Sequence, residues 1–289
     1  MDKQFIIAAQ ELGTMDQFVS YRKQIGAKSI EFPKYSNLAL ATSPLSEKED
    51  PASVALVDSQ ILLTPAEYGN VVTPSKLASL QSGGIADLAA ARLVGINMQS
   101  SLDKLAILAA EAGGNEIFPG TVTAEANLVG TDVMTTSFLN RLYNKLSRSK
   151  IAPLSNGMYV IVLHPDVVHD LRDSTGAGSF SDITKYSRPE EVLKGEIGML
   201  AGFRIIENAN ISINADAGST TVDSYHCLAM GFNALGKAVS AEPGMKITGP
   251  FDKLGRYINI GWTGCLKYGL VDTDSLWVGT VASSVGANT

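Results

Sequence analysis

One long helical pattern constrains the fold of this 289-residue chain more than any other feature. Apolar residues recur at helical spacing through residues 84–112, and Gly113 and Gly114 end the pattern. At 1.5 Å per residue such a helix is about 40 Å long, and it far exceeds the average of about 11 residues. The segment is therefore predicted to be an extended structural support. The apolar residues that define the pattern are Ile85, Leu88, Ala89, Leu93 and Ile96, with Leu105, Leu108 and Ala109 further along.

Residues 27–75, which precede this helix, have the pattern of two extended limbs. The first limb is "AKSIEFPKYSNLALAT", with the apolar Ile30 and Phe32, and the second is "DSQILLTPAEYGNVVT". Pro33 and Pro65 interrupt the limbs, and proline is tolerated only in edge or irregular strands. A charged segment, "SPLSEKEDPAS", lies between them. The pattern predicts a long projecting hairpin, and because two strands alone are barely stable, a partner surface on this or another chain.

The rest of the chain mixes strands and helices without a regular βαβ repeat, which indicates an α+β fold. Residues 1–26 form an arm with too little apolar surface to fold alone. Residues 131–148 are predicted to form a helix capped by Thr131 or Asp132. The face of this helix is expected to carry Phe138, Leu139, Leu142 and Leu146.

The stretch "YVIVLHPDVVHDLRDS", residues 159–174, raises the question of an active site. Its apolar run predicts a strand covered on both faces. Pro165 suits the first turn of a helix, and Asp166 suits the positive end of the helix dipole. We therefore interpret the stretch as a strand-to-helix junction.

The histidines do not form a metal or nucleophile site by their spacing. His164 and His169 are five residues apart, about 140° around a helix, so they cannot bind one metal from a single face. His226 and Cys227 are adjacent, and on a strand adjacent side chains point to opposite faces. The Gly-rich "GAGSF" lacks the context of a dinucleotide fingerprint and is interpreted as a flexible loop tip. No catalytic residue, cofactor or metal is expected, and the protein is not expected to be an enzyme.

The composition supports a sizeable core, because 45% of residues are hydrophobic and 18% are charged. The formal net charge of −6 disfavours tight binding of nucleic acid, which needs clustered Lys and Arg, although the chain can still enclose it. Cys227 and Cys265 match no zinc or redox spacing and are expected to be free thiols. No apolar run approaches the ~20 residues that span a bilayer, so no membrane partner is expected.

Several stretches, in this order, resemble a tailed-bacteriophage major capsid protein of the Hong Kong 97 type. "KSIEFPKYSNLALATSPLSEKED" and "ILLTPAEYGNVVTPS" resemble the limbs of its extended loop, and "IADLAAARLVGINMQSSLDKLAILAA" resembles its spine helix. "MYVIVLHPDVVHDLRDS" and "EEVLKGEIGMLAGFRIIENANI" resemble consecutive parts of its axial domain. "GRYINIGWTGCLKYGLVDTDSLWVGTV" resembles the closing strands.

The resemblance implies a Hong Kong 97-like α+β capsid fold and a structural role. It implies a subunit that self-assembles into pentamers and hexamers of an icosahedral head and encloses double-stranded DNA without sequence-specific binding. Further partners would be portal, scaffolding and decoration proteins, with assembly in the host cytoplasm and a final location in the virion. The expected parts are an N-terminal arm (1–26), the extended hairpin loop (27–75), a peripheral domain with the spine helix (76–130), an axial domain (131–245) and return strands to the peripheral domain (246–289).

Subunit contacts are expected at the charged hairpin tip and at the Gly-rich loop, which the resemblance places near the capsomer axis. Two alternatives remain open: an encapsulin-like compartment shell with protein cargo, and a cytoplasmic α+β enzyme of unknown chemistry. The residues expected at contacts are Glu47, Lys48, Glu49, Asp50, Gly176 and Gly178.

Overall fold

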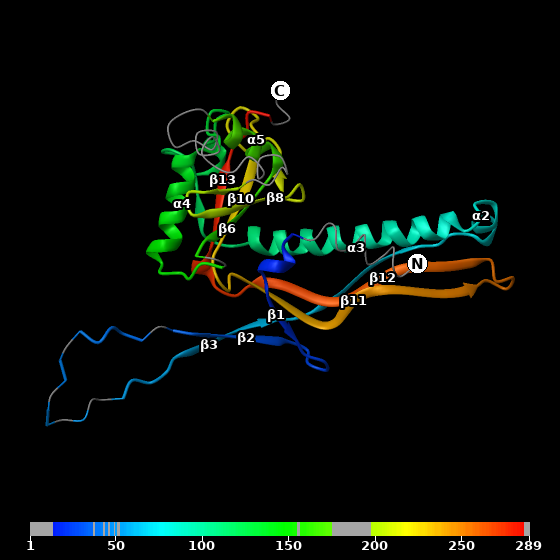
Figure 1. The fold of residues 1–289 in the computed structure, drawn as a ribbon, viewed down its shortest axis with the longest axis horizontal. Helices are drawn as coiled ribbons and strands as arrows, with labels where there is room; N and C mark the ends of the chain where they lie inside the picture. Colours follow the sequence, from blue (N-terminus) through cyan, green and yellow to red (C-terminus); the bar gives the residue numbers. More distant parts are fainter. Residues whose placement is uncertain are drawn as a thin grey trace.

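The computed structural model describes residues 14–36, 38–42, 44–45, 47–48, 50, 53–154, 157–174 and 198–285. The molecule is elongated (Figure 1). At one end a sheet with helices forms a thick body. The helix α3 extends from this body together with two long strands, β11 and β12, and the β2–β3 hairpin extends in the opposite direction.

A four-stranded sheet runs beside α3 in the order β1-β11-β12-β4. The strand β1 pairs in parallel with β11, and the other neighbours pair antiparallel. The strand β4 lies at one edge, so one side of its backbone has no strand partner in this sheet. The bounds are β1 (Ser20–Lys23), β4 (Ala66–Val72), β11 (Leu235–Phe251) and β12 (Tyr257–Leu270), with the helices α2 (Lys76–Gln81) and α3 (Ile85–Glu111).

The prediction of a long helix over 84–112 is confirmed, since α3 spans Ile85–Glu111. The residues that define its pattern in the sequence, however, are not its buried face. Ile85 is 70% exposed and Leu93 is 62% exposed. The buried face of the N-terminal half instead consists mostly of small residues. It contains Ala90, Ala91, Val94, Gly95 and Met98. Apolar residues occur all around the helix, so periodicity alone cannot select the face that packs on the sheet.

A seven-stranded sheet forms the thick body, with β6 in its interior between β10 and β8. All five residues of β6 are buried, which confirms the prediction of a strand covered on both faces. Val160 and Val162 belong to the core that includes α3, whereas Tyr159, Ile161 and Leu163 belong to the core beneath α4 and α5. The strands are β5 (Glu116–Ile117), β6 (Tyr159–Leu163), β7 (Met199–Leu200), β8 (Phe203–Glu207), β9 (Ile213–Asn214), β10 (Ser224–Met230) and β13 (Leu276–Val281).

The start of the helix α4 in this body is set by its N-terminal cap. The helix α4 spans Thr136–Arg148 and is capped by Thr135, whose side chain accepts a hydrogen bond from the Phe138 amide. The predicted start at residue 131 is therefore wrong, because Asp132 instead accepts from the Val129 amide within the preceding turn. The buried face of α4 is the predicted one, Phe138, Leu139, Leu142 and Leu146.

The junction after β6 is as predicted from the sequence. The helix α5 spans Pro165–Asp173 with Pro165 in its first turn, and the His164 side chain accepts from the Asp166 amide. The strand β6 and this helix are therefore connected by a single capping residue.

The predicted hairpin exists, but its second limb is shorter than the sequence suggested. The strand β2 (Ile30–Tyr35) pairs antiparallel with β3 (Asp58–Leu63). Residues 66–72, interpreted as a continuation of the second limb, are the edge strand β4 of the other sheet. Pro65 lies at this break, where the chain leaves one sheet for the other.

Residues 14–23 of the predicted arm pack against α3 and the four-stranded sheet. They comprise the short 3-10 helix η1 (Asp16–Phe18) and the strand β1. Met15 is fully buried, and β1 pairs with β11. Two further 3-10 helices are η2 (Glu125–Asn127) and η3 (Thr273–Ser275).

Candidate functional site

The hairpin is attached to the body at a small apolar cluster that depends on two glycines. Gly236 of β11 and Gly269 of β12 are cross-strand partners. A Cβ atom on Gly269 would lie 2.4 Å from Leu63 Cδ2, and one on Gly236 would lie 2.9 Å from the Phe32 ring. The absence of side chains at this pair therefore allows the base of the hairpin to lie directly on the four-stranded sheet. The cluster, termed here the hairpin base, consists of Ile30, Phe32, Leu63, Ala238 and Val271.

An ion pair fixes the hairpin base from a second side. Lys34 Nζ of β2 lies 2.6 Å from Asp272 Oδ1, and Asp272 also accepts from the Ser275 hydroxyl and the Asp274 amide. Partial burial alone would raise the pKa of Asp272, but the hydrogen bonds from Lys34 and Ser275 outweigh it and hold this pKa below its ordinary value. The carboxylate is thus ionised and bound to β2 at neutral pH.

Beyond its base the hairpin exposes many apolar side chains. Leu40 and Leu45 are each 77% exposed, and in Figure 1 this loop lies apart from the rest of the chain. A monomer rarely exposes so much contiguous apolar surface unless a partner covers it. The exposed apolar residues of this segment are Tyr35, Leu38, Leu40, Leu45, Val54, Leu56, Val57 and Leu62.

The residues predicted at subunit contacts are only partly within the described structure. Glu47, Lys48 and Asp50 are exposed at the tip of the hairpin loop. Glu49 lies outside the described residues, as do Gly176 and Gly178 with most of the Gly-rich loop. The described tip residues lie close together in the sequence and are exposed. Their contacts with a neighbouring subunit stay a prediction.

The three histidines lie at separate places. His164 caps α5, and its ring lies beside that of Tyr225, with centroids 5.2 Å apart and planes inclined at 46°. His169 is on the exposed side of the same helix. Full burial raises the pKa of the Cys227 thiol far above its ordinary value, which makes it a poor nucleophile. Within the described part of the chain, no group of three or more His, Cys, Asp or Glu is placed to hold a metal ion.

His226 belongs to a polar cluster that sequence inspection missed. Its Nδ1 lies 3.7 Å from Glu111 Oε1 at the C-terminal end of α3, and its Nε2 lies 3.3 Å from Asn214 Nδ2. Glu111 also accepts from the Ser212 amide and hydroxyl, and Glu125 accepts from Asn214 and the Ser224 hydroxyl. The cluster connects α3 to β9, β10 and η2. Its members are far apart in the sequence, so no local motif signals it.

The ionisation of this cluster follows from its contacts. The Glu111 carboxylate, 3.7 Å from Nδ1, raises the pKa of His226, and this effect outweighs the opposing effect of burial. Burial would raise the pKa of Glu111, but the nearby His226 and the hydrogen bonds from Ser212 lower it. Burial would likewise raise the pKa of Glu125, but hydrogen bonds from Ser224 and Asn214 lower it. The neighbouring carboxylates therefore make His226 easier to protonate than a free histidine.

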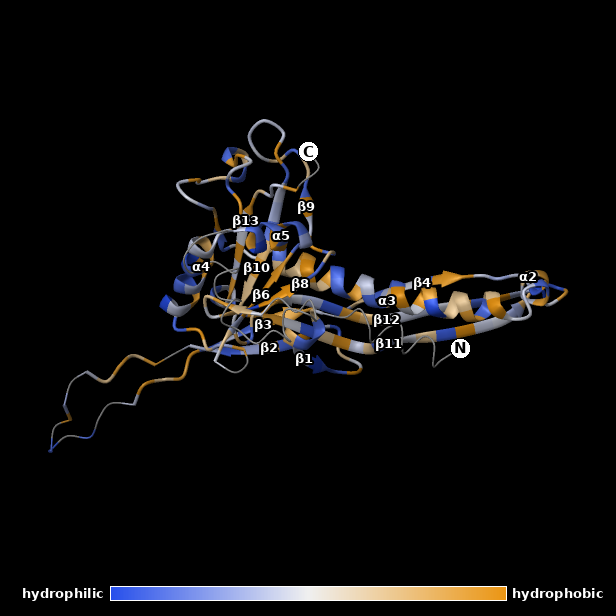
Figure 2. Ribbon diagram, turned by 45° about the horizontal axis from the view of Figure 1, so that its top comes forward, coloured by the Kyte–Doolittle hydropathy of each residue, from blue (hydrophilic) through white to orange (hydrophobic). Residues whose placement is uncertain are grey.

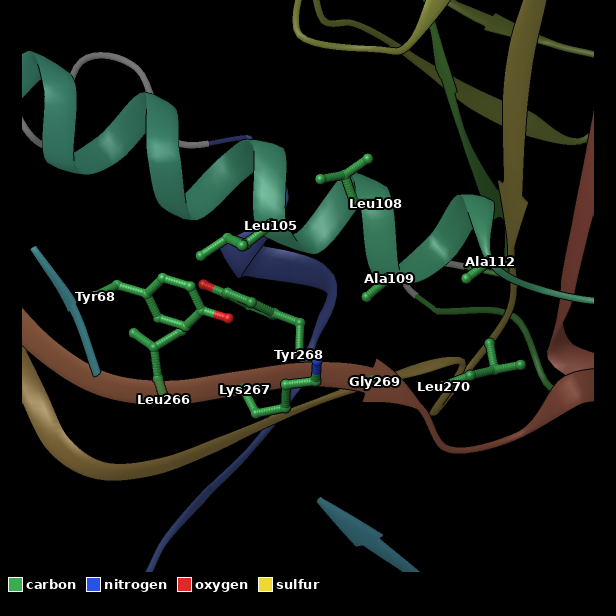
Figure 3. Close-up of a pocket in the computed structure, with 10 residues that line it drawn as sticks. All are labelled: Tyr68, Leu105, Leu108, Ala109, Ala112, Leu266, Lys267, Tyr268, Gly269 and Leu270. Carbon is green, nitrogen blue, oxygen red and sulfur yellow. The ribbon is translucent and has the colours of Figure 1, made fainter. Parts of the chain in front are cut away.

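A cavity of about 400 Å³ lies between α3 and β12 (Figure 3). Its wall is mainly apolar, with the ring of Tyr68 beneath Leu105 and the ring of Tyr268 beside it. The Tyr268 hydroxyl donates to Asp16 at 2.6 Å, so this polar group is already satisfied within the chain. We find no convergent acid, base and nucleophile among the described residues that line it.

No helix among the described residues is long and apolar enough to cross a membrane. Two surfaces expose apolar side chains that nothing in the described chain covers. They are the hairpin loop and the long helix α3. Two sheets thus lie beside one long helix, and a projecting hairpin is fixed to one of them at a glycine pair.

Comparison with known proteins gives the family. The family model described as phage capsid protein matches residues 86–249, more than half of the chain. The chain belongs to this family, and it is a structural major capsid protein. No curated protein matches it.

Solved structures agree with this fold over nearly the whole chain. The capsid of Ralstonia phage GP4 matches with a TM-score of 0.74 at 14% identity, covering 94% of this chain and 92% of that chain. The capsid asymmetric unit of cyanophage Pam1 matches with a TM-score of 0.69 at 13% identity, covering 95% and 88%. A virus-like particle from Pyrococcus furiosus matches with a TM-score of 0.59 at 13% identity, covering 96% of each chain.

Proposed function

We propose that copies of this chain form pentamers and hexamers of an icosahedral phage head that encloses double-stranded DNA. The observation that carries the proposal is the hairpin: its base is held on the sheet, whereas the loop beyond exposes a long apolar surface. A neighbouring copy provides the same complementary surface at every position of a ring, so a symmetric shell can cover every hairpin.

The proposed contacts include the charged tip, Glu47, Lys48, Glu49 and Asp50, and the loop with Gly176 and Gly178 nearer the capsomer axis. The proposed division is the one expected from the sequence, into arm, hairpin loop, peripheral domain, axial domain and return strands, except that residues 14–23 and 66–72 pack with the four-stranded sheet and its helix. It is supported by the two separate sheets, one beside α3 and one in the thick body. The role is structural and does not include catalysis.

The enclosed DNA would be held by confinement. The net charge of −6 gives no excess of cations to neutralise phosphates, so sequence-specific or tight binding is not part of the proposal. Assembly would occur in the host cytoplasm, with portal, scaffolding and decoration proteins as further partners, and the product would reside in the virion.

The test replaces three exposed apolar residues of the hairpin loop together, Leu38→Ser, Leu40→Ser and Leu56→Ser. Because none of the three is in the hairpin base, the subunit should keep its circular dichroism spectrum, while sedimentation should show most of the chain unassembled. The matched control replaces exposed apolar residues of the thick body, Val129→Ser, Ile213→Ser and Val285→Ser, and should assemble normally. Normal shells from the hairpin variant would refute the proposed contact.

A compartment shell with protein cargo is the second candidate, because the virus-like particle from Pyrococcus furiosus also matches the fold. The match to the phage capsid family makes this candidate less favoured than the phage head. Nuclease treatment of purified particles separates the two: DNA that survives nuclease is expected for a phage head, and protein cargo without protected DNA for a compartment.

A further inference from the structure

The N-terminal half of α3 carries an uncovered apolar surface. We term it the α3 stripe, and it consists of the exposed Ile85, Leu88, Ala89 and Leu93 and the half-buried Ile96. These residues lie on one side of the helix, opposite the buried side that contains Ala91 and Val94. Figure 2 shows hydrophobic segments along the exposed length of this helix.

The same side of the helix is covered further along. Positions seven and eleven residues apart lie within about 20° of each other around a helix, so Asp103 and Ile107 continue the line of Ile96. Both are buried. Ile107 is fully buried in the main core, and Asp103 is covered by Thr14, Met15 and Asn208. The covered part of this side therefore ends where residues 14 and 15 lie against the helix.

The position of Thr14 is fixed by several contacts. Asp103 Oδ1 accepts from the Met15 amide at 2.9 Å, from the Thr14 amide at 3.2 Å and from the Thr14 hydroxyl at 3.1 Å. The thirteen residues that precede Thr14 in the sequence are thus attached to the helix at the boundary of the α3 stripe. Their sequence, "MDKQFIIAAQELG", is apolar at Phe5, Ile6 and Ile7.

We propose that residues 1–13 of the same chain dock on the α3 stripe, with Phe5, Ile6 and Ile7 supplying the apolar contacts. Arg92 lies within the stripe, is exposed and has no ion pair with the described residues, so it can pair with Asp2 or Glu11 of the segment, which also carries Lys3. The docked segment would extend the cover that Thr14 and Met15 begin.

The geometry allows this contact without stretching the chain. Leu93 lies ten residues before Asp103, which is about 15 Å along the helix. Ile7 lies seven residues before Thr14, and seven residues span about 10 Å as a helix and up to about 23 Å when extended. Ile7 can therefore reach Leu93 when the segment is more extended than a helix.

The test is a disulfide between Ile7→Cys and Leu93→Cys in the full chain, formed with copper phenanthroline. The background carries Cys265→Ser, while the fully buried Cys227 is retained. The expected product is an intrachain disulfide, seen as a monomer of altered mobility on a non-reducing gel. The control pairs Ile7→Cys with Leu45→Cys at the far end of the hairpin loop, which should not close.

Hydrogen exchange supplies a second, independent readout. In the triple variant Phe5→Ser, Ile6→Ser, Ile7→Ser, the amide hydrogens of residues 85–97 should exchange with solvent about tenfold faster than in the wild type, or more. The amides of residues 103–110 should keep their protection. A disulfide that joins two chains would overturn docking within one chain and assign the stripe to a second copy. Absence of both the disulfide and the change in exchange would overturn the proposal altogether.

Discussion

At the scale of single residues, the glycine pair beneath the hairpin makes the sharpest prediction. A Cβ on Gly236 would meet Val271 Cγ2 at 2.6 Å and two Phe32 ring atoms at 2.9 and 3.0 Å. These side chains are branched or rigid, so they cannot move aside at low cost. Gly236→Ala should lower the free energy of unfolding by about 1–3 kcal/mol, the usual cost of overpacking.

Chemical denaturation measures this change, and limited proteolysis within residues 36–57 reports whether the hairpin detaches. Gly244→Ala is the matched control, because it lies in the same strand and its Cβ would meet nothing within 4 Å. Equal stability of the two variants would contradict the account of the hairpin base.

The His226 cluster predicts how stability depends on pH. The pKa of His226 is raised in the folded chain above its ordinary value of 6.5. Its contribution to stability is therefore fully present below pH 6.5 and is lost as the pH rises through the folded value. The pKa values of Glu111 and Glu125 are lowered below 4.5, so their contributions are present above pH 4.5 and are lost on acidification.

His226 is faced by Glu111 of α3, Glu125 of η2, Glu116 of β5 and Asn214 of β9. The difference in melting temperature between wild type and His226→Gln should therefore be largest between about pH 4.5 and 6.5 and shrink as the pH rises further. Thermal unfolding across this range measures it. A difference that grows with rising pH would contradict the raised pKa of His226.

At the scale of elements, the ends of α3 were predictable but its buried face was not. Gly113 and Gly114 mark the C-terminal end chemically, whereas two apolar faces compete for the sheet. The structure selects the one with Ala90, Ala91 and Gly95, since small residues permit close approach to the sheet. The seventeen-residue strand β11 was not predicted, because Pro243, Gly244 and Gly249 interrupt its pattern.

The two sides of α3 near its C-terminal end should respond differently to added volume. Ala106 is fully buried, so Ala106→Leu should cost about 1–3 kcal/mol of stability. Ala109 lines the cavity of Figure 3, so Ala109→Leu can place its added atoms there and should be tolerated. Denaturation curves of the two variants test this order, and the reverse order would mean that the helix is rotated from its described position.

The charged hairpin tip predicts a salt-dependent effect on assembly. Reversing Glu47, Glu49 and Asp50 to Lys should leave the subunit folded, because the tip is remote from the hairpin base. Exposed ion pairs are each worth only ~0.2–1 kcal/mol and weaken with salt, but a shell repeats the contact at every subunit. Shell yield should therefore fall most at low ionic strength. Sedimentation decides this, and wild-type yield at every salt concentration would mean that the tip is only a solvated turn.

At the scale of the whole molecule, the sequence predicted the α+β class and the projecting hairpin, but not how the hairpin is attached. Phe32 lies over Gly236, and Leu63 lies over Gly269, more than two hundred residues away in the chain. Local patterns carry no signal for such contacts. The same holds for Asp103, whose partners come from residues 14–15 and from Asn208.

The central claim is that this chain is a shell subunit whose hairpin is covered by a neighbouring copy. Electron cryo-microscopy of purified particles tests it most directly. The account predicts closed shells of pentamers and hexamers in which residues 36–57 lie on the adjacent subunit. A hairpin folded back on its own chain within such shells, or a 30.5 kDa monomer under every assembly condition, would contradict it.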